Sequence, residues 1–326
     1  MADLKPRRVV QPRPGSFNTK PDPHVTRVET TYATISDVLS SQLCTLKSLT
    51  SPALRSWGQR LRPVWDPEGI NPLEMLVHRK MWEWLYICEA LAERDMLQSG
   101  RSGIGFGVGK EPLVAVFAAE GCRILASDLP PDMAEASGWR QSGVEYADGL
   151  EGLNEAGLCD AGAFANLVSY RHVDMNSIPS DLGQFDFSWS SCAFEHLGSL
   201  SAGADFIVNQ MRLVRAGGVA VHTTEFNTSS DDDTISTGAT VLYRRQDLVE
   251  LVERLTDGGY RIDLDLTEGD SPADQHIDVP PFSDTHLRTM LGEFATTSVA
   301  LVIEKPSDWS PPRRRRWWKH SRGIRR

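Results

Sequence analysis

The chain has 326 residues, of which 40% are apolar and 24% charged, a composition that is typical of a globular protein and excludes a disordered or fibrous chain. No segment approaches the ~20 consecutive apolar residues that span a bilayer, and the first twenty residues lack the apolar core of a secretory signal. The five cysteines are scattered and form no C-x-x-C pair, which argues against a disulfide framework and a zinc site. We therefore expect a cytoplasmic protein.

The net charge of −10 is unevenly distributed along the chain. The last sixteen residues carry eight basic side chains, which leaves −18 on the rest. Such an acidic body disfavours non-specific nucleic-acid binding, because that binding depends on neutralising phosphates. We expect no nucleic-acid partner for it.

The basic tail combines four arginines with two tryptophans and a lysine, in residues 313–319. Anionic membrane surfaces attract such segments, and Trp prefers the headgroup region. Peripheral contact with the inner face of a membrane is therefore one hypothesis. A tail without a partner and a tail that stacks on single-stranded nucleic acid are the alternatives.

The first hundred residues predict an arm and a helical cap. Residues 1–34 are rich in Pro, Arg and Thr without periodicity, which indicates a flexible arm. Residues 35–99 predict the cap, with a weak helical pattern over 35–61. Asn71 can cap a second helix, Pro72 suits its first turn, and an apolar stripe predicts that this helix covers residues 73–97.

From residue 100 onward, strands and helices alternate. Since parallel strands need crossover connections, the pattern predicts an α/β fold with a doubly wound, Rossmann-like and mostly parallel sheet over residues 100–306. No helix is predicted between the last two strands, which allows one of them to run antiparallel; residues 307–326 then form the flexible basic tail. The predicted strands cover residues near 103–104, 122–128, 167–173, 185–190, 218–223, 261–266 and 297–303, and the main helices cover 112–120, 199–214 and 246–255, with an irregular insertion at 132–164.

A glycine loop follows the first strand of this alternating region. Gly105, Gly107 and Gly109 permit a tight turn and a close approach of a ligand to the backbone. Asp128 lies 23 residues after Gly105, at the end of the next strand, where a carboxylate can accept hydrogen bonds from ribose hydroxyls. This order predicts a site for an adenosine-containing cofactor. A dinucleotide fingerprint has a glycine where Lys110 stands, which disfavours a nicotinamide cofactor without excluding it.

Further sequence motifs along the chain, together with the loop, resemble those of a known family. The ordered set is similar to the class I S-adenosylmethionine-dependent methyltransferases over residues 100–304. One departure is Gly103, which stands where this family usually has an acidic residue that helps to orient the amino-acid end of the cofactor. The segments that carry the resemblance are Gly105-Phe106-Gly107-Val108-Gly109, Ala126-Ser127-Asp128, Val173-Asp174-Met175, residues 185–191 with Phe194-Glu195-His196-Leu197, and Leu213-Val214-Arg215-Ala216-Gly217-Gly218.

The resemblance implies a seven-stranded sheet whose last strand is antiparallel, with S-adenosylmethionine as the cofactor. Residues 78–80, 105–113 and 222–227 also resemble a bacterial subgroup of methyltransferases whose genes often lie near those for surface-polysaccharide assembly. A hydroxyl of a saccharide or a related small molecule is therefore the expected acceptor. The residues expected to contact the cofactor are Gly105, Phe106, Gly107, Gly109, Asp128, Leu129, Asp174, Met175 and Ser190.

Transfer to an alcohol requires alignment of the nucleophile and removal of its proton. The loops after the fourth and fifth strands supply the candidates His196, Glu195 and Glu225, because a histidine titrates near neutrality. Contact with the cofactor or capping of the next helix is the alternative for the Glu-His pair. His222 is expected in the core, and Asn227 is a candidate for acceptor contact.

Two further points stay open from the sequence. Arg79 and Lys80 form either a solvated basic patch or a recognition site for an anionic acceptor such as a sugar phosphate. His276 and Asp278 have no ligand spacing that supports a cation site, so no metal site is predicted. A nicotinamide-dependent oxidoreductase and a cofactor-binding scaffold without turnover are the alternative functions.

Overall fold

The computed structural model describes residues 38–69, 77–141, 145–282 and 285–311. The predicted arm at 1–34, the capping residues Asn71 and Pro72, and residues 312–326 of the basic tail lie outside these ranges. From Val38 onward the described residues form one compact unit.

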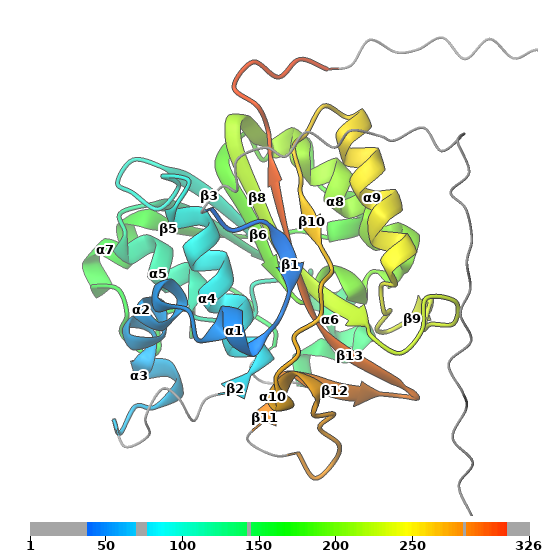
Figure 1. Cartoon of the computed structure of the whole chain (residues 1–326). Helices are drawn as coiled ribbons and strands as arrows, with labels where there is room; N and C mark the ends of the chain where they lie inside the picture. Colours follow the sequence, from blue (N-terminus) through cyan, green and yellow to red (C-terminus); the bar gives the residue numbers. More distant parts are fainter. Residues whose placement is uncertain (1–37, 70–76, 142–144, 283–284, 312–326) are drawn as a thin grey trace, which may run out of the picture. The chain divides into compact units, whose positions relative to one another are not determined.

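One large sheet organises this unit (Figure 1). Within the described ranges the sheet has nine strands: β1 Ser41–Leu43, β3 Ser102–Phe106, β4 Arg123–Asp128, β5 Val168–His172, β6 Phe185–Ser191, β8 Val214–Asn227, β10 Leu264–Asp265, β12 Arg288–Leu291 and β13 Phe294–Glu304. The order is β10-β1-β13-β8-β6-β3-β4-β5, and β12 pairs with β13. The strands from β8 to β5 are parallel, whereas β13 is antiparallel to both β8 and β1. Two small pairs are β2 Val77–His78 with β11 Thr285–His286, and β7 Gly198–Ser199 with β9 Thr237–Gly238.

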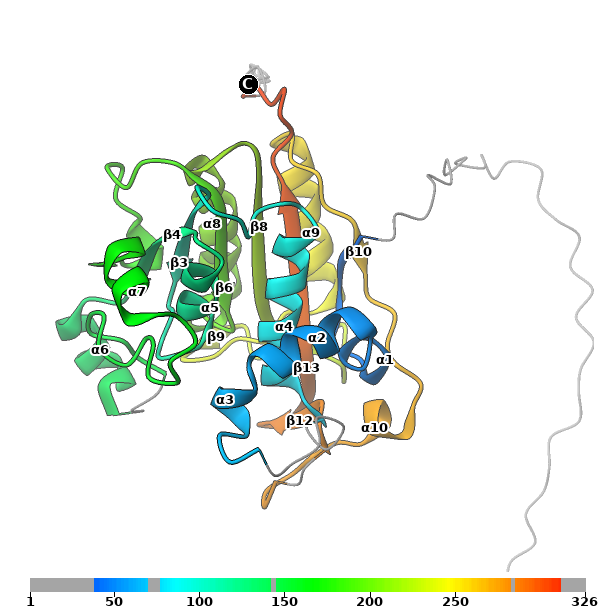
Figure 2. The same cartoon turned by 90° about the vertical axis from the view of Figure 1, so that its left-hand side faces the viewer.

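Helices cover both faces of the sheet (Figures 1 and 2). One face carries α2 Pro52–Arg60, α4 Arg79–Ala92, α5 Leu113–Ala119 and α7 Ala161–Leu167, and the other carries α8 Leu200–Gln210 and α9 Arg245–Asp257. The shorter helices are α1 Leu46–Leu49, α3 Arg62–Trp65, α6 Pro131–Ser137 and α10 Pro272–Gln275, with single 3-10 turns at Trp139–Gln141, Met175–Ser177, Phe194–His196 and Met211–Leu213.

Two hydrophobic clusters fill the space between the sheet and its helices, one on each face. Val221 belongs to the cluster under α4 and α5, whereas its neighbour Ala220 belongs to the cluster under α8 and α9. On β13, Val302 likewise belongs to the cluster under α4 and α5, and Leu301 to the cluster under α8 and α9. Successive side chains of a strand point to opposite faces, so a strand buried on both faces is apolar along its length.

The predicted doubly wound, Rossmann-like sheet is confirmed, with nine strands in place of the expected seven. The additions are β1 and β12. The helical pattern expected over 35–61 is wrong at β1, where Ser41 lies buried and its hydroxyl accepts a hydrogen bond of 2.9 Å from the backbone N–H of Val302. Pairing with a strand far along the chain overrides the weak local helix preference.

The long helix begins later than the sequence predicts. Val77 and His78 form β2, and α4 starts at Arg79. The imidazole of His78 caps the helix by accepting a hydrogen bond of 3.1 Å from the N–H of Lys80. The helix ends at Ala92, before the predicted end at residue 97.

The described part of the predicted tail, residues 307–311, is held against the domain. The indole of Trp309 stacks on Tyr260 with a centroid distance of 5.7 Å and donates a hydrogen bond of 2.9 Å to the carbonyl of Gly258. The ammonium of Lys305 lies 4.1 Å from the centre of the same indole ring. In the ranges that the structure covers, no helix has the length and apolar character needed to cross a membrane.

A test of β1 is the substitution Leu43→Ala. Leu43 is only 2% exposed, and β1 fills the gap between β13 and β10, so we expect the free energy of unfolding to fall by about 2–5 kcal/mol. Val38→Ala is the matched control, since Val38 is 39% exposed and its truncation should change little. Urea unfolding followed by circular dichroism measures both. An unchanged midpoint for Leu43→Ala would show that β1 is a detachable arm.

Candidate functional site

The glycine loop leaves the sheet at the point where its strand order reverses. β3 lies between β4 and β6, and in open α/β sheets ligands bind in the crevice outside such strand ends. Gly107 and Gly109 have φ angles of +57° and +49°, a backbone region that favours glycine. Gly105 is also required, because a Cβ there would lie 2.4 Å from the Trp189 ring.

Three strand exits meet at Gly107. A Cβ at this position would lie 2.9 Å from the Cβ of Ala193 and 3.6 Å from the sulfur of Met175. Ala193 follows β6, and Met175 opens the 3-10 turn after β5. The structure therefore brings the predicted loop and Met175 together, beside the segment that leads to Glu195 and His196.

Asp128 at the end of β4 is tied to the glycine loop. Its Oδ2 accepts hydrogen bonds from the N–H groups of Gly109 and Ala147, at 3.0 and 3.2 Å, and its Oδ1 accepts one from Leu129 at 2.8 Å. Burial raises the pKa of this carboxyl, and the three backbone donors oppose that rise. Since a carboxylate oxygen can accept two hydrogen bonds, Oδ1 keeps capacity for one further donor.

The other predicted cofactor residues are placed differently. Asp174 caps the 3-10 turn after β5 by accepting a hydrogen bond of 2.8 Å from Asn176. The side chains of Phe106 and Ser190 are fully buried and offer a ligand no surface. Ser190 shares a hydrogen bond of 2.8 Å with Nδ1 of His222. Contact of Asp174, Phe106 and Ser190 with a cofactor stays a prediction from the resemblance.

The departure at Gly103 has a packing explanation. Gly103 pairs with Phe187 across β3 and β6, and a Cβ on Gly103 would lie 2.3 Å from the Phe187 ring. An acidic side chain there would displace this phenylalanine, which is fully buried between the sheet and Phe117 of α5. In this chain the Phe187 ring occupies the space that a side chain at position 103 would need.

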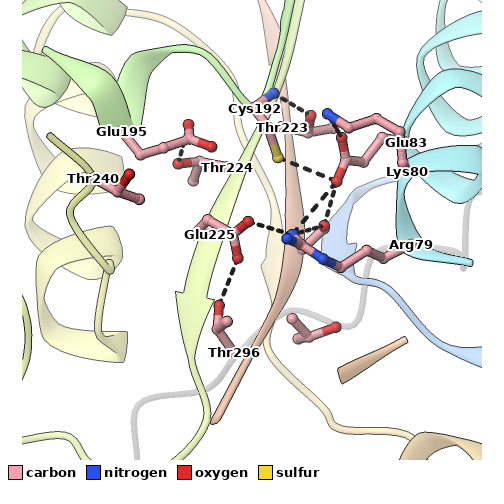
Figure 3. A network of polar contacts seen from close by, with 12 residues as sticks. Arg79, Lys80, Glu83, Cys192, Glu195, Thr223, Thr224, Glu225, Thr240 and Thr296 are labelled. Atoms are coloured by element: carbon pink, nitrogen blue, oxygen red, sulfur yellow. Dashed lines mark hydrogen bonds and ion pairs between the residues drawn. The ribbon is translucent and has the colours of Figure 1, made fainter. Parts of the chain in front are cut away.

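A polar network lies between α4 and strands β8 and β13, and includes Cys192 after β6 (Figure 3). Its centre is Glu83, which is fully buried. The Glu83 carboxylate pairs with the Lys80 ammonium at 2.9 Å, and it accepts hydrogen bonds from the Cys192 thiol at 3.1 Å, from Ser191 at 3.2 Å and from the Ser298 hydroxyl. Burial alone would raise its pKa, but Lys80 and Arg79 outweigh that effect and hold the pKa at about 2.

Glu225 connects the network to the end of β8. Its Oε1 pairs with the guanidinium of Arg79, and its Oε2 accepts a hydrogen bond of 2.7 Å from Thr296. Arg79 and Lys80 are thus largely engaged with carboxylates of the chain itself, with side chains only 19% and 34% exposed. This excludes a purely solvated basic patch.

Glu195 and His196 follow β6 on the other side of Glu225. Glu195 is 1% exposed, and its Oε2 accepts a hydrogen bond of 2.9 Å from Thr224. Its Oε1 accepts no hydrogen bond from any residue that the structure describes. Burial raises the pKa of this carboxyl. His196 lies with Nε2 4.0 Å from that Oε1 and Nδ1 2.8 Å from the carbonyl of Ala239.

Other sequence-based candidates have structural roles. His222 is fully buried, as expected for a core residue, and burial lowers its pKa to about 3. Asn227 is 2% exposed and arranges the following loop through hydrogen bonds to Ser229 and Asp233. Asp278 pairs with His286 at 2.6 Å.

Glu83 and Cys192 were not predicted as site residues. The charges at 79, 80 and 83 share one helix face by spacing, which was the available signal for Glu83. Cys192 has none, because its partners come from α4, the turn after β6, and β8. One ligand atom from each of Cys192, Glu195 and Glu225 lies within 4.8 Å of the other two, so three residues that could hold a metal meet where none was predicted.

No protein-family model matches this chain, and no curated protein matches it. Among solved structures it is similar to a putative sarcosine dimethylglycine methyltransferase from Galdieria sulphuraria, with 14% identity, a TM-score of 0.43, and coverage of 70% of this chain and 86% of that one. It is also similar to a magnesium protoporphyrin IX methyltransferase from Synechocystis PCC 6803, with 11% identity, a TM-score of 0.41, and coverage of 76% of this chain and 94% of that one. A third similar structure is an S-adenosylmethionine-dependent methyltransferase from Clostridium acetobutylicum, with 10% identity, a TM-score of 0.38, and coverage of 77% of this chain and 98% of that one. The chemistry of the site follows from the chain's own residues.

The buried His222 makes stability sensitive to acid. Its folded pKa of about 3 lies below the unfolded value of 6.5, so the unfolded state binds the proton first and stability falls as the pH drops below 6.5. We expect this residue alone to lower the free energy of unfolding at pH 5 by about 2 kcal/mol relative to pH 7.5. His222→Asn should remove this part of the pH dependence, whereas His276→Asn, at an exposed position, should keep it. Urea unfolding at both pH values measures the difference. If the free energy of unfolding changed by the same amount between the two pH values in both variants, the assignment would be contradicted.

Proposed function

We propose that this chain is an S-adenosylmethionine-dependent methyltransferase whose acceptor is a hydroxyl of a saccharide or a related small molecule. The observation that carries the proposal is the meeting of Gly107, Met175 and Ala193 at the switch point of the sheet, beside Asp128. The ordered motifs of the sequence support it.

The residues at this point fit an adenosine-containing cofactor. Gly107 lets the backbone of the loop approach Ala193 and Met175 closely, and Met175 lies on a segment that carries the resemblance, so we place the adenine ring on this side of the loop. The remaining acceptor capacity of Asp128 Oδ1 suits a ribose hydroxyl. When bound, S-adenosylmethionine supplies an electrophilic methyl group to this site.

His196 is the proposed proton acceptor for the hydroxyl. Its Nδ1 lies 2.8 Å from the carbonyl of Ala239, which favours the tautomer with the proton on Nδ1. Nε2 then carries the lone pair that accepts the proton. The His196 side chain is 22% exposed. After proton transfer, the carboxylate of Glu195 at 4.0 Å stabilises the imidazolium.

The polyhydroxyl character of the proposed acceptor matches the network beyond His196. Carboxylates accept hydrogen bonds from hydroxyl groups, and Glu195 and Glu225 already accept them from Thr224 and Thr296. Of the two, only Glu225 keeps some exposed side-chain surface, at 8%, so we propose Glu225 as the group that orients an acceptor hydroxyl. The resemblance to a subgroup near polysaccharide genes favours this class of acceptor.

Calorimetric titration of the full chain with S-adenosylmethionine, S-adenosylhomocysteine and NADH tests the cofactor. We expect the first two to bind and NADH to give no heat. Gly107→Ala should weaken binding at least tenfold (roughly 1.4 kcal/mol), because the new methyl group meets Ala193 in a left-handed backbone region. Gly138→Ala is the matched control, with φ of +83° and open space around it, and should bind normally. Binding of NADH alone would overturn the proposal.

Transfer of a labelled methyl group to fractionated saccharide and small-molecule extracts tests the acceptor and the base. We expect label in a hydroxyl-bearing product, and a roughly 10²–10⁴-fold slower transfer by His196→Ala because the proton acceptor is lost. Affinity for S-adenosylmethionine should stay unchanged. His276→Ala, at an exposed histidine, should transfer normally. Equal rates for both variants would exclude His196 as the base.

A further inference from the structure

We propose that Cys192, Glu195 and Glu225 form a binding site for one divalent cation of the zinc type. One ligand atom from each residue lies within 4.8 Å of the other two. Cys192 and Glu195 follow β6, and Glu225 lies near the end of β8, so two adjacent parallel strands present the set at one edge of the sheet.

The buried oxygen of Glu195 points to a missing partner. Glu195 is 1% exposed, and its Oε1 accepts no hydrogen bond within the part of the chain that the structure covers. His196 is 4.0 Å away, beyond hydrogen-bond range. A buried carboxylate is costly unless it is paired or coordinates a metal, and Glu195 has no close cation among the described residues.

The network also has more carboxylates than positive groups, so a bound cation would balance its charge. Lys80 pairs with Glu83 at 2.9 Å and lies 3.5 Å from Glu111, and Arg79 pairs with Glu225. These two positive groups face four carboxylates when Glu195 is included. Burial raises the pKa of Glu111 to about 7, so even with Glu111 protonated three carboxylates face two cations.

The donor set favours zinc over magnesium. Zinc accepts sulfur and carboxylate oxygen together at ~2.0–2.3 Å, whereas magnesium requires an octahedron of oxygens. Three protein ligands leave a fourth tetrahedral position open, as in catalytic zinc sites. Glu225 can take part without losing Arg79 or Thr296, because each of its oxygens has a second lone pair.

Cys192 is held in an unusual backbone conformation that presents its thiol to this cluster. Its φ of +43° lies in the left-handed region, which a non-glycine residue rarely adopts. The backbone N–H of Cys192 donates to the carbonyl and to the hydroxyl of Thr223, at 3.1 and 3.0 Å, and these contacts hold the turn. The thiol now donates to Glu83. As the sulfur–metal bond forms, the thiol proton leaves to solvent, so binding strengthens as the pH rises.

The open coordination position would receive the acceptor oxygen. This use of the metal rests on the proposed methyl transfer, whereas the metal site itself does not. Metal binding and cofactor binding are therefore measured separately.

Titration of the chelator-treated full chain with Co²⁺, followed by displacement with Zn²⁺, tests the site. We expect one Co²⁺ per chain, a thiolate-to-cobalt charge-transfer band in the near ultraviolet, and loss of the band when Zn²⁺ is added. Cys192→Ser should lose the band, and Glu195→Gln should keep it while binding Co²⁺ at least tenfold more weakly. Cys159→Ser is the matched control, because Cys159 is also a free, buried cysteine but lies outside the cluster, and it should behave as the wild type.

The melting temperature gives a second readout that does not depend on the band. Zn²⁺ should raise it in the wild type and in Cys159→Ser, and should change it little in Glu195→Gln. No Co²⁺ binding at millimolar metal, a band that persists in Cys192→Ser, or an equal Zn²⁺ shift in Glu195→Gln would overturn the site. Calorimetry with S-adenosylmethionine on the same metal-free protein distinguishes this failure from failure of the proposed function.

Discussion

A single buried carboxylate, Glu83, determines how α4 sits on the sheet. Because a buried charge must be paired, Lys80 on the same helix, the Cys192 thiol after β6 and the Ser298 hydroxyl on β13 are all drawn to it. These contacts join a helix from the first third of the chain to strands from its last half. They fix the wall of the polar network and thereby the positions of the groups beyond it. Hydrophobic burial alone would leave the rotation of α4 about its axis less well determined.

The space in front of β3 is shaped by aromatic packing as much as by glycine. Phe187 and Trp189 occupy the volume beside Gly103 and Gly105, and both rings contact Phe117 of α5 edge to face. Gly103 and Gly105 are therefore required by the core, whereas Gly107 is required by the close approach of Ala193 and by its positive φ. A glycine motif thus combines two physical requirements, close packing behind the strand and free backbone in front of it.

Local patterns predicted the parts of this protein that depend on local sequence. The alternation of strands and helices after residue 100, the glycine turn and the buried position of His222 follow from periodicity and φ preferences, and the structure has them. Contacts between distant segments were missed. β1 pairs with a strand some 260 residues away, as the Ser41–Val302 separation of 261 shows. The cluster of Cys192, Glu195 and Glu225 joins two strand ends, and no spacing along the chain announces it.

The position of β1 has a consequence for the order in which the molecule is assembled. The ribosome releases this strand early, but both of its neighbours, β13 and β10, belong to the last quarter of the chain. The central parallel strands can pair during synthesis, whereas β1 must wait until nearly all of the protein has emerged. Closing so long a loop is entropically unfavourable and slow compared with local contacts. The edge of the sheet is therefore sealed last, and until then β13 offers an open edge to any strand that reaches it first.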